Sequence, residues 1–249
     1  MSGPRNSDGV SNPFFARVWT LMSAHETEAL TRLRQDNLDA LSGRVLEVGA
    51  GTGTNFAHYP PTVAEVLAVE PEPLLAGHAR TAATAAPVPV RVTEQTVESL
   101  SDAEPFDAVV CSLVLCTVDD AEHVARQLFS VLKPGGELRY MEHVASAGWR
   151  GGVQRAADAT VWPRLFGGCH THRNTEATLS GAGFELRGVL LEPVAGGAEL
   201  VKDTHAPRER VVVHAVAVVV DAVVVAVGRL GQHLPGAGQP LAVGAACPR

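Results

Sequence analysis

The sequence predicts an α/β fold in which a mostly parallel sheet is covered by helices on both faces. Short apolar runs alternate with helical stretches along the chain, and this alternation requires parallel strands joined by crossover helices. The first apolar run ends in a glycine-rich turn at 49–53, and the second ends in an acid, Glu70. In an open parallel sheet both features lie at the same edge, so a ligand site is expected there.

The elements follow from apolar periodicity and from residues that begin or end helices. We expect strands at 44–49, 65–70, 88–93, 106–112, 136–143 and 184–191. Between Phe14 and Leu41 apolar residues recur at helical spacing and predict one or two helices; further helices are expected at 54–58, 72–85, 120–132, 151–163 and 173–182. Asp119 and Asp120 can cap the helix at 120–132, and "LKPGG" at 132–136 should end it and turn the chain.

The two ends of the chain differ from this pattern. Residues 1–12 are polar and are expected to be disordered, so we place one domain at 13–200 and a Val/Ala/Gly-rich tail of uncertain structure at 201–249. Within that tail, 211–227 contains only Val and Ala apart from His214 and Asp221. It can be a buried strand or hairpin that completes the sheet, a poorly structured segment of anomalous sequence, or a membrane segment. The central Asp disfavours the last, because it costs roughly 2.5–3.5 kcal/mol in a bilayer.

Composition restricts the class of protein. The 249 residues carry a formal charge of −7 and are 46% hydrophobic, so a broad nucleic-acid surface is not expected. Four cysteines without a C-x-x-C pair suit free thiols in a reducing compartment. The N-terminus has no apolar segment preceded by basic residues, so we expect no secretory signal, no stable membrane insertion and a cytoplasmic location. Composition does not indicate the oligomeric state.

The glycine turn in "VLEVGAGTGTNF" (45–56) excludes two common ligand motifs. A P-loop needs a lysine after its last glycine, and no lysine lies nearby. A dinucleotide fingerprint needs G-x-G-x-x-G, whereas the third glycine here comes one residue early, at Gly53. The next strand ends in Glu70, whose carboxylate can accept hydrogen bonds from both hydroxyls of a ribose. Together the turn and the acid predict a site for a nucleoside.

Five stretches now resemble the class I S-adenosylmethionine-dependent methyltransferases: "LEVGAGTGTNF", "VLAVEP", "FDAVVCSLVLCTV", "VLKPGGELRYMEHV" and "GAGF". They occur in the order and at the spacing of that family, over roughly residues 14–190. "YPP", "CSLVLCTV", "MEHV" and "GCHTHRNT" are most similar to its small-molecule branch, which includes thiol S-methyltransferases. The resemblance implies a Rossmann-like, doubly wound, mostly parallel seven-stranded sheet with strand order 3-2-1-4-5-7-6 and the last strand antiparallel.

The resemblance also implies S-adenosylmethionine as the cofactor and assigns residues to it. The glycine turn would wrap the methionine part and Glu70 the ribose, while Thr96 occupies the position at which many relatives place an Asp against the adenine. Arg17 falls where relatives close an N-terminal helix over the cofactor, although an exposed helix arginine explains it equally well. The implied cofactor residues are Arg17, Glu47, Gly49, Ala50, Gly51, Gly53, Glu70, Pro71, Thr96, Val97, Ser112 and Leu113.

The expected function is methyl transfer to a small, largely apolar acceptor, with a thiol as the first choice. An oxygen or nitrogen acceptor, such as a quinone precursor or a phospholipid amine, remains the alternative, as does a protein that binds the cofactor without turnover. The candidate catalytic residue is His143, either as a general base or as a structural histidine. The expected acceptor pocket consists of Trp149, Trp162, Phe166, Cys169 and Arg173.

"CHTH" (169–172) raises the question of a metal, since Cys and His are common zinc ligands. No second Cys/His cluster stands at a recognised spacing, so no metal site is expected. Cys111 and Cys116 flank a predicted buried strand end and are expected to be packing residues.

Overall fold

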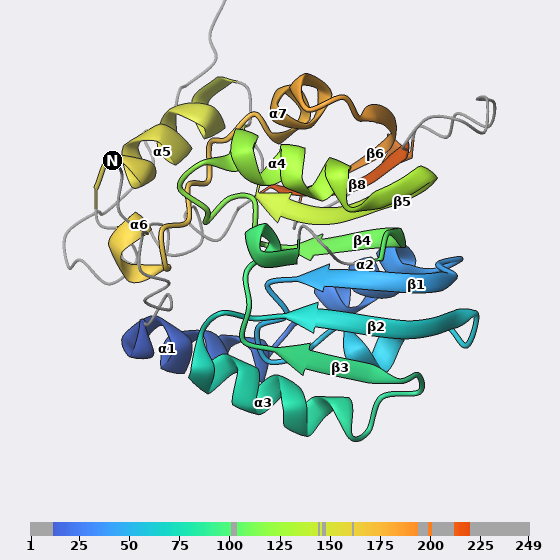
Figure 1. Ribbon diagram of the computed structural model, residues 1–249. Coiled ribbons are helices and arrows are strands. Elements are labelled where there is room, and N and C mark those ends of the chain that lie inside the picture. Colours follow the sequence, from blue (N-terminus) through green and yellow to red (C-terminus); the bar gives the residue numbers. More distant parts are fainter. Residues whose placement is uncertain are drawn as a thin grey trace, which may run out of the picture.

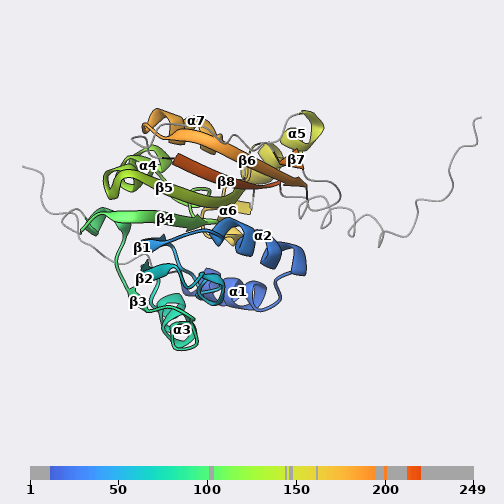
Figure 2. The ribbon, with the colours of Figure 1, turned by 90° about the vertical axis from the view of Figure 1, so that its right-hand side faces the viewer.

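The computed structural model describes residues 12–100, 104–143, 145, 148–160, 162–193, 199–200 and 212–219. A twisted sheet crosses the middle of the molecule, with helices on both of its sides (Figures 1 and 2). Residues 1–11 of the predicted disordered N-terminus lie outside the described residues, as does the predicted tail (201–249) except for one strand at 212–219.

The sheet contains eight described strands: β1 (Gly43–Val48), β2 (Val63–Val69), β3 (Val90–Thr93), β4 (Phe106–Ser112), β5 (Leu132–His143), β6 (Glu185–Pro193), β7 (Glu199–Leu200) and β8 (Val212–Val219). Their order across the sheet is β3-β2-β1-β4-β5-β8-β6-β7. Neighbouring strands are parallel except β6 with β7. The Rossmann-like arrangement is therefore confirmed. The strand order reverses between β1 and β4, where such sheets bind ligands beyond their carboxyl ends.

The strand count and the direction of the strand beside β5 differ from expectation. The described sheet has eight strands rather than seven, and β8 pairs in parallel with both β5 and β6, where an antiparallel strand was expected. The sequence of β8 is Val and Ala apart from His214, which is typical of a strand with neighbours on both sides. The chain between Pro193 and Val212 is long enough for the crossover that a parallel strand requires. The strand interpretation thus holds for 212–219, whereas 220–227 lies outside the described residues.

The described helices are α1 (Pro13–Ser23), α2 (Glu28–Leu38), α3 (Pro73–Ala83), α4 (Ala121–Ser130), α5 (Gly148–Asp158), α6 (Trp162–Leu165) and α7 (Thr175–Gly181), with 3-10 turns η1 (Phe56–His58) and η2 (Val97–Leu100). The helix expected at 151–163 is therefore two helices. Strand β5 begins already at Leu132, because Leu132 pairs with Phe106 after α4 has ended. Of the helices that the structure describes, none is both long and apolar enough to pass through a membrane.

Polar side chains begin five of these helices by accepting the backbone N–H three residues later, which satisfies a donor that the helix leaves free. These caps are Asn12, Thr27, Glu72, Asp120 and Asn174. Asp120 thus caps α4 as predicted from the sequence.

Alternate strand residues pack into two separate cores, one on each face of the sheet. In β4, Val109 belongs to the core shared with α4 and α7, whereas Val110 belongs to the core shared with α3 and the segment after α2. Both faces of the central strands are buried, so the carboxyl ends of β1, β2, β4 and β5 are held in fixed relative positions. These four strand ends border the cavity described next.

Candidate functional site

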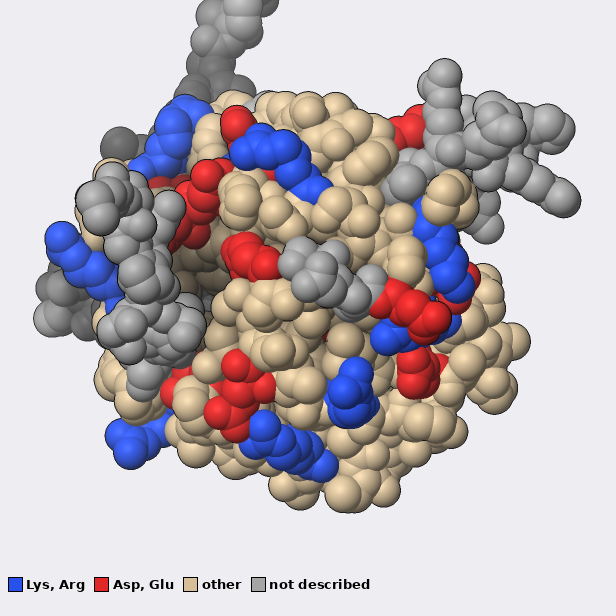
Figure 3. Space-filling model, viewed as in Figure 1, with Lys and Arg blue, Asp and Glu red and all other residues tan. Residues whose placement is uncertain are grey.

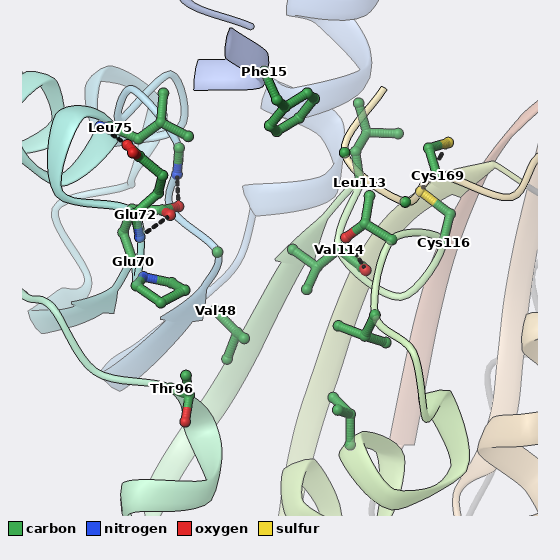
Figure 4. Close-up of a pocket in the computed structure, with 18 of the residues that line it drawn as sticks. Phe15, Val48, Glu70, Glu72, Leu75, Thr96, Leu113, Val114, Cys116 and Cys169 are labelled. Carbon is green, nitrogen blue, oxygen red and sulfur yellow. Dashed lines mark hydrogen bonds between the residues drawn. The ribbon is translucent and has the colours of Figure 1, made fainter. Parts of the chain in front are cut away.

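A cavity of about 660 Å³ lies beyond the carboxyl ends of the central strands. Figure 4 shows Glu70 and Glu72 on one side of it and Cys116 and Cys169 on the other, with Leu113 between them. Figure 3 shows a hollow in this region of the molecule with acidic side chains around it. Two ends can therefore be distinguished: an acidic end at the tips of β1 and β2, and a sulfur-rich end beside β4 and β5.

The glycine turn after β1 has a backbone conformation that side chains disfavour. Gly49, Gly51 and Gly53 have φ angles of 65°, 57° and 80°, in the left-handed region that glycine occupies without strain. A Cβ atom on Gly49 would lie 2.5 Å from Val114, and one on Gly51 would lie 2.8 Å from Nε1 of Trp19. Gly49 and Gly51 line the cavity, whereas Ala50 and Gly53 lie behind it.

Glu47 is buried beneath this turn and does not line the cavity. Its two carboxylate oxygens accept hydrogen bonds from Asn55 Nδ2 at 2.9 Å and from the Tyr59 hydroxyl at 2.7 Å. Arg34 in turn donates to Asn55 at 2.9 Å. Burial raises the pKa of Glu47 from 4.5 to about 7, against the lowering effect of the two hydrogen bonds. Glu47 therefore supports the turn from below.

Glu70, at the end of β2, lines the cavity and is nearly buried. One carboxylate oxygen accepts the backbone N–H of Gly51 at 2.8 Å, and the other accepts that of Glu72 at 3.0 Å. Burial raises the pKa of Glu70, although these two N–H groups lower it in part. The structure thus brings together the glycine turn and the strand-end acid that the sequence paired, and the space beside them is open.

The loop of residues 95–98 and the end of β4 supply the next part of the wall. Thr96, Val97, Ser112 and Leu113 all line the cavity, as does Pro71 after β2. Leu113 has a φ angle of 61°, which is unusual for a residue with a side chain.

Glu142, which sequence reasoning did not assign to the site, holds the loop that follows β4. It is fully buried at the end of β5 and accepts the backbone N–H groups of Val114, Leu115 and Cys116 at 2.7, 2.8 and 3.1 Å. Burial raises its pKa, while these three donors lower it. Because β-strand side chains alternate, Glu142 faces the loop and His143 faces the cavity. The sequence signal that could have identified Glu142 is the acid in "MEHV".

Helix α1 covers the cavity with the face that carries Phe15, Trp19 and Met22. Arg17 is exposed and lies outside the cavity. Residues 15, 19 and 22 recur at helical spacing, and residue 17 lies on the other side of the same helix. The helix that the resemblance placed over the site does cover the cavity, but through Phe15, Trp19 and Met22 rather than through Arg17.

At the sulfur-rich end, Trp162 and Phe166 stack with ring centroids 4.1 Å apart and line the cavity with Cys169. Two other residues expected in this wall are elsewhere. Trp149 lies on α5, is 66% exposed and does not line the cavity. Arg173 lies behind the wall, where it donates to the carbonyl oxygens of Leu115 and Val118 and so supports the loop after β4.

Cys116, His143 and Cys169 meet in the cavity wall. Nδ1 of His143 lies 3.1 Å from Sγ of Cys169 and 3.6 Å from Sγ of Cys116, and the two sulfurs are 3.7 Å apart. The Cys116 thiol and then His143 lower the pKa of Cys169 to about 5, although burial opposes them. Contact with Cys169, followed by burial, raises the pKa of Cys116. The pKa shifts favour loss of a proton from Cys169 before Cys116, and Cys116 lines the cavity as well as packing against Cys169.

Comparison with known proteins agrees with this geometry. A family model described as a methyltransferase domain matches residues 22–187. The human thiol S-methyltransferase TMT1A is 32% identical over 184 residues, covering 69% of this chain and 74% of that protein. A ubiquinone biosynthesis O-methyltransferase from Xanthomonas euvesicatoria is 36% identical over 103 residues, covering 41% of this chain and 43% of its own.

A solved structure shares the fold. A SAM-dependent methyltransferase from Thermotoga maritima superposes with a TM-score of 0.51 at 21% identity, covering 76% of this chain and 92% of that one.

Proposed function

The chain belongs to the methyltransferase family and is an S-adenosylmethionine-dependent methyltransferase, and from this premise we propose that its acceptor is a small, largely apolar thiol. S-adenosylmethionine supplies a methyl group that is already activated on a positively charged sulfur. The chain therefore has to bind the donor, place the acceptor in line with the S–CH₃ bond and exclude water.

The charges around the cavity fit a cationic donor. Five carboxylates line it, and no Lys or Arg occurs among its described lining residues. Carboxylates that surround a partly buried space favour a positively charged ligand and disfavour a negatively charged one. The acidic lining residues are Glu70, Glu72, Glu98, Asp119 and Asp120.

The shape of the acidic end supports a division of labour for the cofactor. Bare backbone at Gly49 and Gly51 leaves room for the amino-acid part, because a side chain at either position would collide with Val114 or Trp19. Each oxygen of Glu70 accepts one N–H group and keeps a lone pair for a ribose hydroxyl. The loop that carries Thr96 and Val97 would cover the adenine.

Three residues of the glycine turn and the strand before it would act on the cofactor indirectly, because they do not line the cavity. Glu47 and Gly53 would maintain the turn, while Ala50 lies within it. Ser112 and Leu113 would border the methionine side. We do not assign Arg17 a contact with the cofactor, since it lies on the far face of α1.

The observation that carries the choice of acceptor is the contact of His143 Nδ1 with both thiols. That nitrogen is engaged by the protein's own sulfurs, which leaves only Nε2 of the ring to take a proton from an acceptor. A Cys169 thiolate with a pKa of about 5 is a weak base. A thiol with the pKa of cysteine, about 8.5, is already ionised to a few per cent at neutral pH and needs little help. The aromatic wall of Trp162 and Phe166 suits an apolar body on such an acceptor.

A phenolic acceptor is the second candidate, and the match to the Xanthomonas O-methyltransferase favours it. That match covers less than half of either chain. A phenol has a pKa near 10 and would need a base more than a thiol does.

An acceptor screen on the full chain tests the proposal. We expect purified protein with S-adenosylmethionine to methylate alkyl and aryl thiols, detected by mass spectrometry of the products, and to leave phenols and amines of similar size unchanged. Methylation of phenols or amines alone would reject the thiol. Tight cofactor binding by calorimetry without transfer to any class would indicate a binding protein.

We also propose that the methyltransferase domain of residues 13–200 is completed by β8. Because β8 lies between β5 and β6, a chain that ends near residue 200 should lose stability in thermal denaturation. Equal melting temperatures for the two lengths would contradict this.

We also propose that the partner of this protein is a small molecule and that the protein is located in the cytoplasm. A formal charge of −7 and an acidic cavity favour a small molecule over nucleic acid as the partner. Free thiols at Cys111, Cys116 and Cys169 suit the reducing cytoplasm, which cell fractionation would test.

A further inference from the structure

Three metal-ligating side chains from separate parts of the chain meet at the sulfur-rich end of the cavity. Cys116 lies in the loop after β4, His143 is the last residue of β5, and Cys169 follows α6. Their ligand atoms all lie within 4.8 Å of one another, and all three residues line the cavity. Sequence spacing could not reveal this group, because its members are 27 and 26 residues apart.

The distances between these atoms match a tetrahedral zinc site. Zn–S bonds of about 2.3 Å and a Zn–N bond of about 2.1 Å, at tetrahedral angles, separate two sulfurs by about 3.8 Å and a sulfur from a nitrogen by about 3.6 Å. The structure has 3.7 Å between Cys116 and Cys169 and 3.6 Å between Cys116 and His143. The third edge, Cys169 to His143, is 3.1 Å and would have to open by about 0.5 Å relative to that ideal.

The backbone around the three residues is tied together, so the arrangement does not depend on flexible side chains alone. The N–H of His170 donates to the carbonyl oxygen of Cys116 at 2.8 Å. Gly168 has a φ angle of 86°, and a Cβ atom there would lie 2.9 Å from the carbonyl oxygen of Thr117, so only glycine lets the two segments approach this closely. On the other side, the backbone N–H of Cys116 donates a hydrogen bond to the carboxylate of Glu142.

We propose that Cys116, His143 and Cys169 bind a Zn²⁺ ion whose fourth coordination position opens into the cavity and receives the sulfur of the thiol acceptor. This rests on the proposed function and deepens it. Two cysteines and one histidine with an open position are the ligand set of a catalytic zinc site rather than a structural one. Zinc has no redox chemistry, so the site needs no electron donor or acceptor.

The site would ionise the acceptor. When the acceptor sulfur binds, its S–H proton leaves to solvent, since a metal-bound thiol is deprotonated. A sulfur lone pair then forms a bond to the methyl carbon while the bond from that carbon to the sulfonium sulfur breaks, leaving a neutral thioether in the cofactor product. The methylated acceptor is also a neutral thioether and a weaker ligand than a thiolate, so it dissociates.

Metal content and cobalt spectroscopy test the site without relying on activity. We expect purified protein to contain about one zinc per chain, and metal-free protein to bind one Co²⁺ with thiolate-to-cobalt absorption in the near ultraviolet and tetrahedral bands in the visible. An added alkyl thiol should shift these bands by occupying the fourth position. Loss of an outer-shell partner alone weakens metal sites about 10–100-fold, so Cys169→Ala and Cys116→Ala should each weaken Co²⁺ binding by more than roughly 100-fold.

Cys111→Ala is the matched control, because Cys111 is a buried free thiol in β4 outside the cluster; it should bind Co²⁺ as the unaltered protein does. Circular dichroism and calorimetry with S-adenosylmethionine establish that each variant is folded. Absence of zinc together with failure of metal-free, reduced protein to bind Co²⁺ would overturn the site, and so would a Cys116–Cys169 disulfide in protein purified under reductant. If the unaltered protein does not bind S-adenosylmethionine, the proposed function is wrong. Metal binding would then stand as a separate result.

Discussion

The carboxylate of Glu70 accepts a hydrogen bond of 2.8 Å from the backbone N–H of Gly51, which joins the tip of β2 to the turn after β1. The two sequence features that indicated a nucleoside site are therefore in direct contact. Their contact fixes the acidic end of the cavity.

Glu70→Ala should weaken S-adenosylmethionine binding by roughly 100-fold. A hydrogen bond to a charged group contributes about 1.5–3 kcal/mol, and about 1.4 kcal/mol corresponds to a tenfold change in affinity. Glu70→Gln keeps one acceptor oxygen, so its affinity for S-adenosylmethionine should lie between those of the unaltered protein and Glu70→Ala. Calorimetry measures the affinities, with Glu28→Gln, at an exposed residue of α2, as the control that should not change. Equal affinity in all four proteins would remove Glu70 from the cofactor site.

Gly51→Ala should weaken cofactor binding and lower stability, because the new methyl group meets Trp19 and the φ angle of 57° disfavours a side chain. A matched control exists at Gly77 in α3, where a Cβ atom would meet nothing within 4 Å. Gly77→Ala should leave binding unchanged and stabilise the protein by about 0.8–1 kcal/mol, the difference in helix propensity. Thermal denaturation and calorimetry together test the pair, and a Gly51→Ala protein that behaves like Gly77→Ala would contradict the close approach of α1.

Trp19→Ala and Arg17→Ala separate the two faces of α1. Trp19 is half-buried and lines the cavity, whereas Arg17 is exposed outside it, so we expect a loss of cofactor affinity of at least about tenfold for Trp19→Ala, because the apolar area that the ring would cover on the cofactor is lost. Arg17→Ala should match the unaltered protein. A larger effect at Arg17 than at Trp19 would restore the assignment made from family resemblance.

Glu47 should make the protein less stable as the pH rises from about 4.5 to about 7. Burial raises its pKa from 4.5 to about 7 in the folded state, so the folded protein holds a proton that the unfolded chain has already lost in this range. The stability contributed by that proton is complete below pH 4.5 and declines by up to about 1.4 kcal/mol per pH unit. Glu47→Gln cannot titrate, so the difference in unfolding free energy between the two proteins, measured in urea at several pH values, should change across this window. A constant difference would show that Glu47 keeps an ordinary pKa.

His143→Ala should reduce methyl transfer while leaving cofactor affinity within about twofold, because His143 contacts the thiols at the far end of the cavity from Glu70. Comparison of kcat with cofactor affinity by calorimetry separates the two effects. Full turnover in this variant would exclude a direct role for His143 at the acceptor end.

The sequence by itself determined the parallel sheet, the glycine turn and the acid at the tip of β2. These features depend on local requirements: apolar runs for buried strands, positive φ for the turn, and a register that brings neighbouring strand ends to one edge. The cap at Asp120 and the contact between Gly51 and Glu70 follow from them.

Only the tertiary structure decided which distant residues meet. The cavity-facing side of α1, the three N–H groups bound by Glu142, the parallel direction of β8 and the meeting of Cys116, His143 and Cys169 all depend on how separate segments pack. Helical periodicity marks the faces of a helix but does not say which one turns inward, and spacing along the chain carries no distance between loops. A cluster of two thiols and an imidazole, built from two loops and one strand end, therefore becomes visible only when the sheet has brought them together.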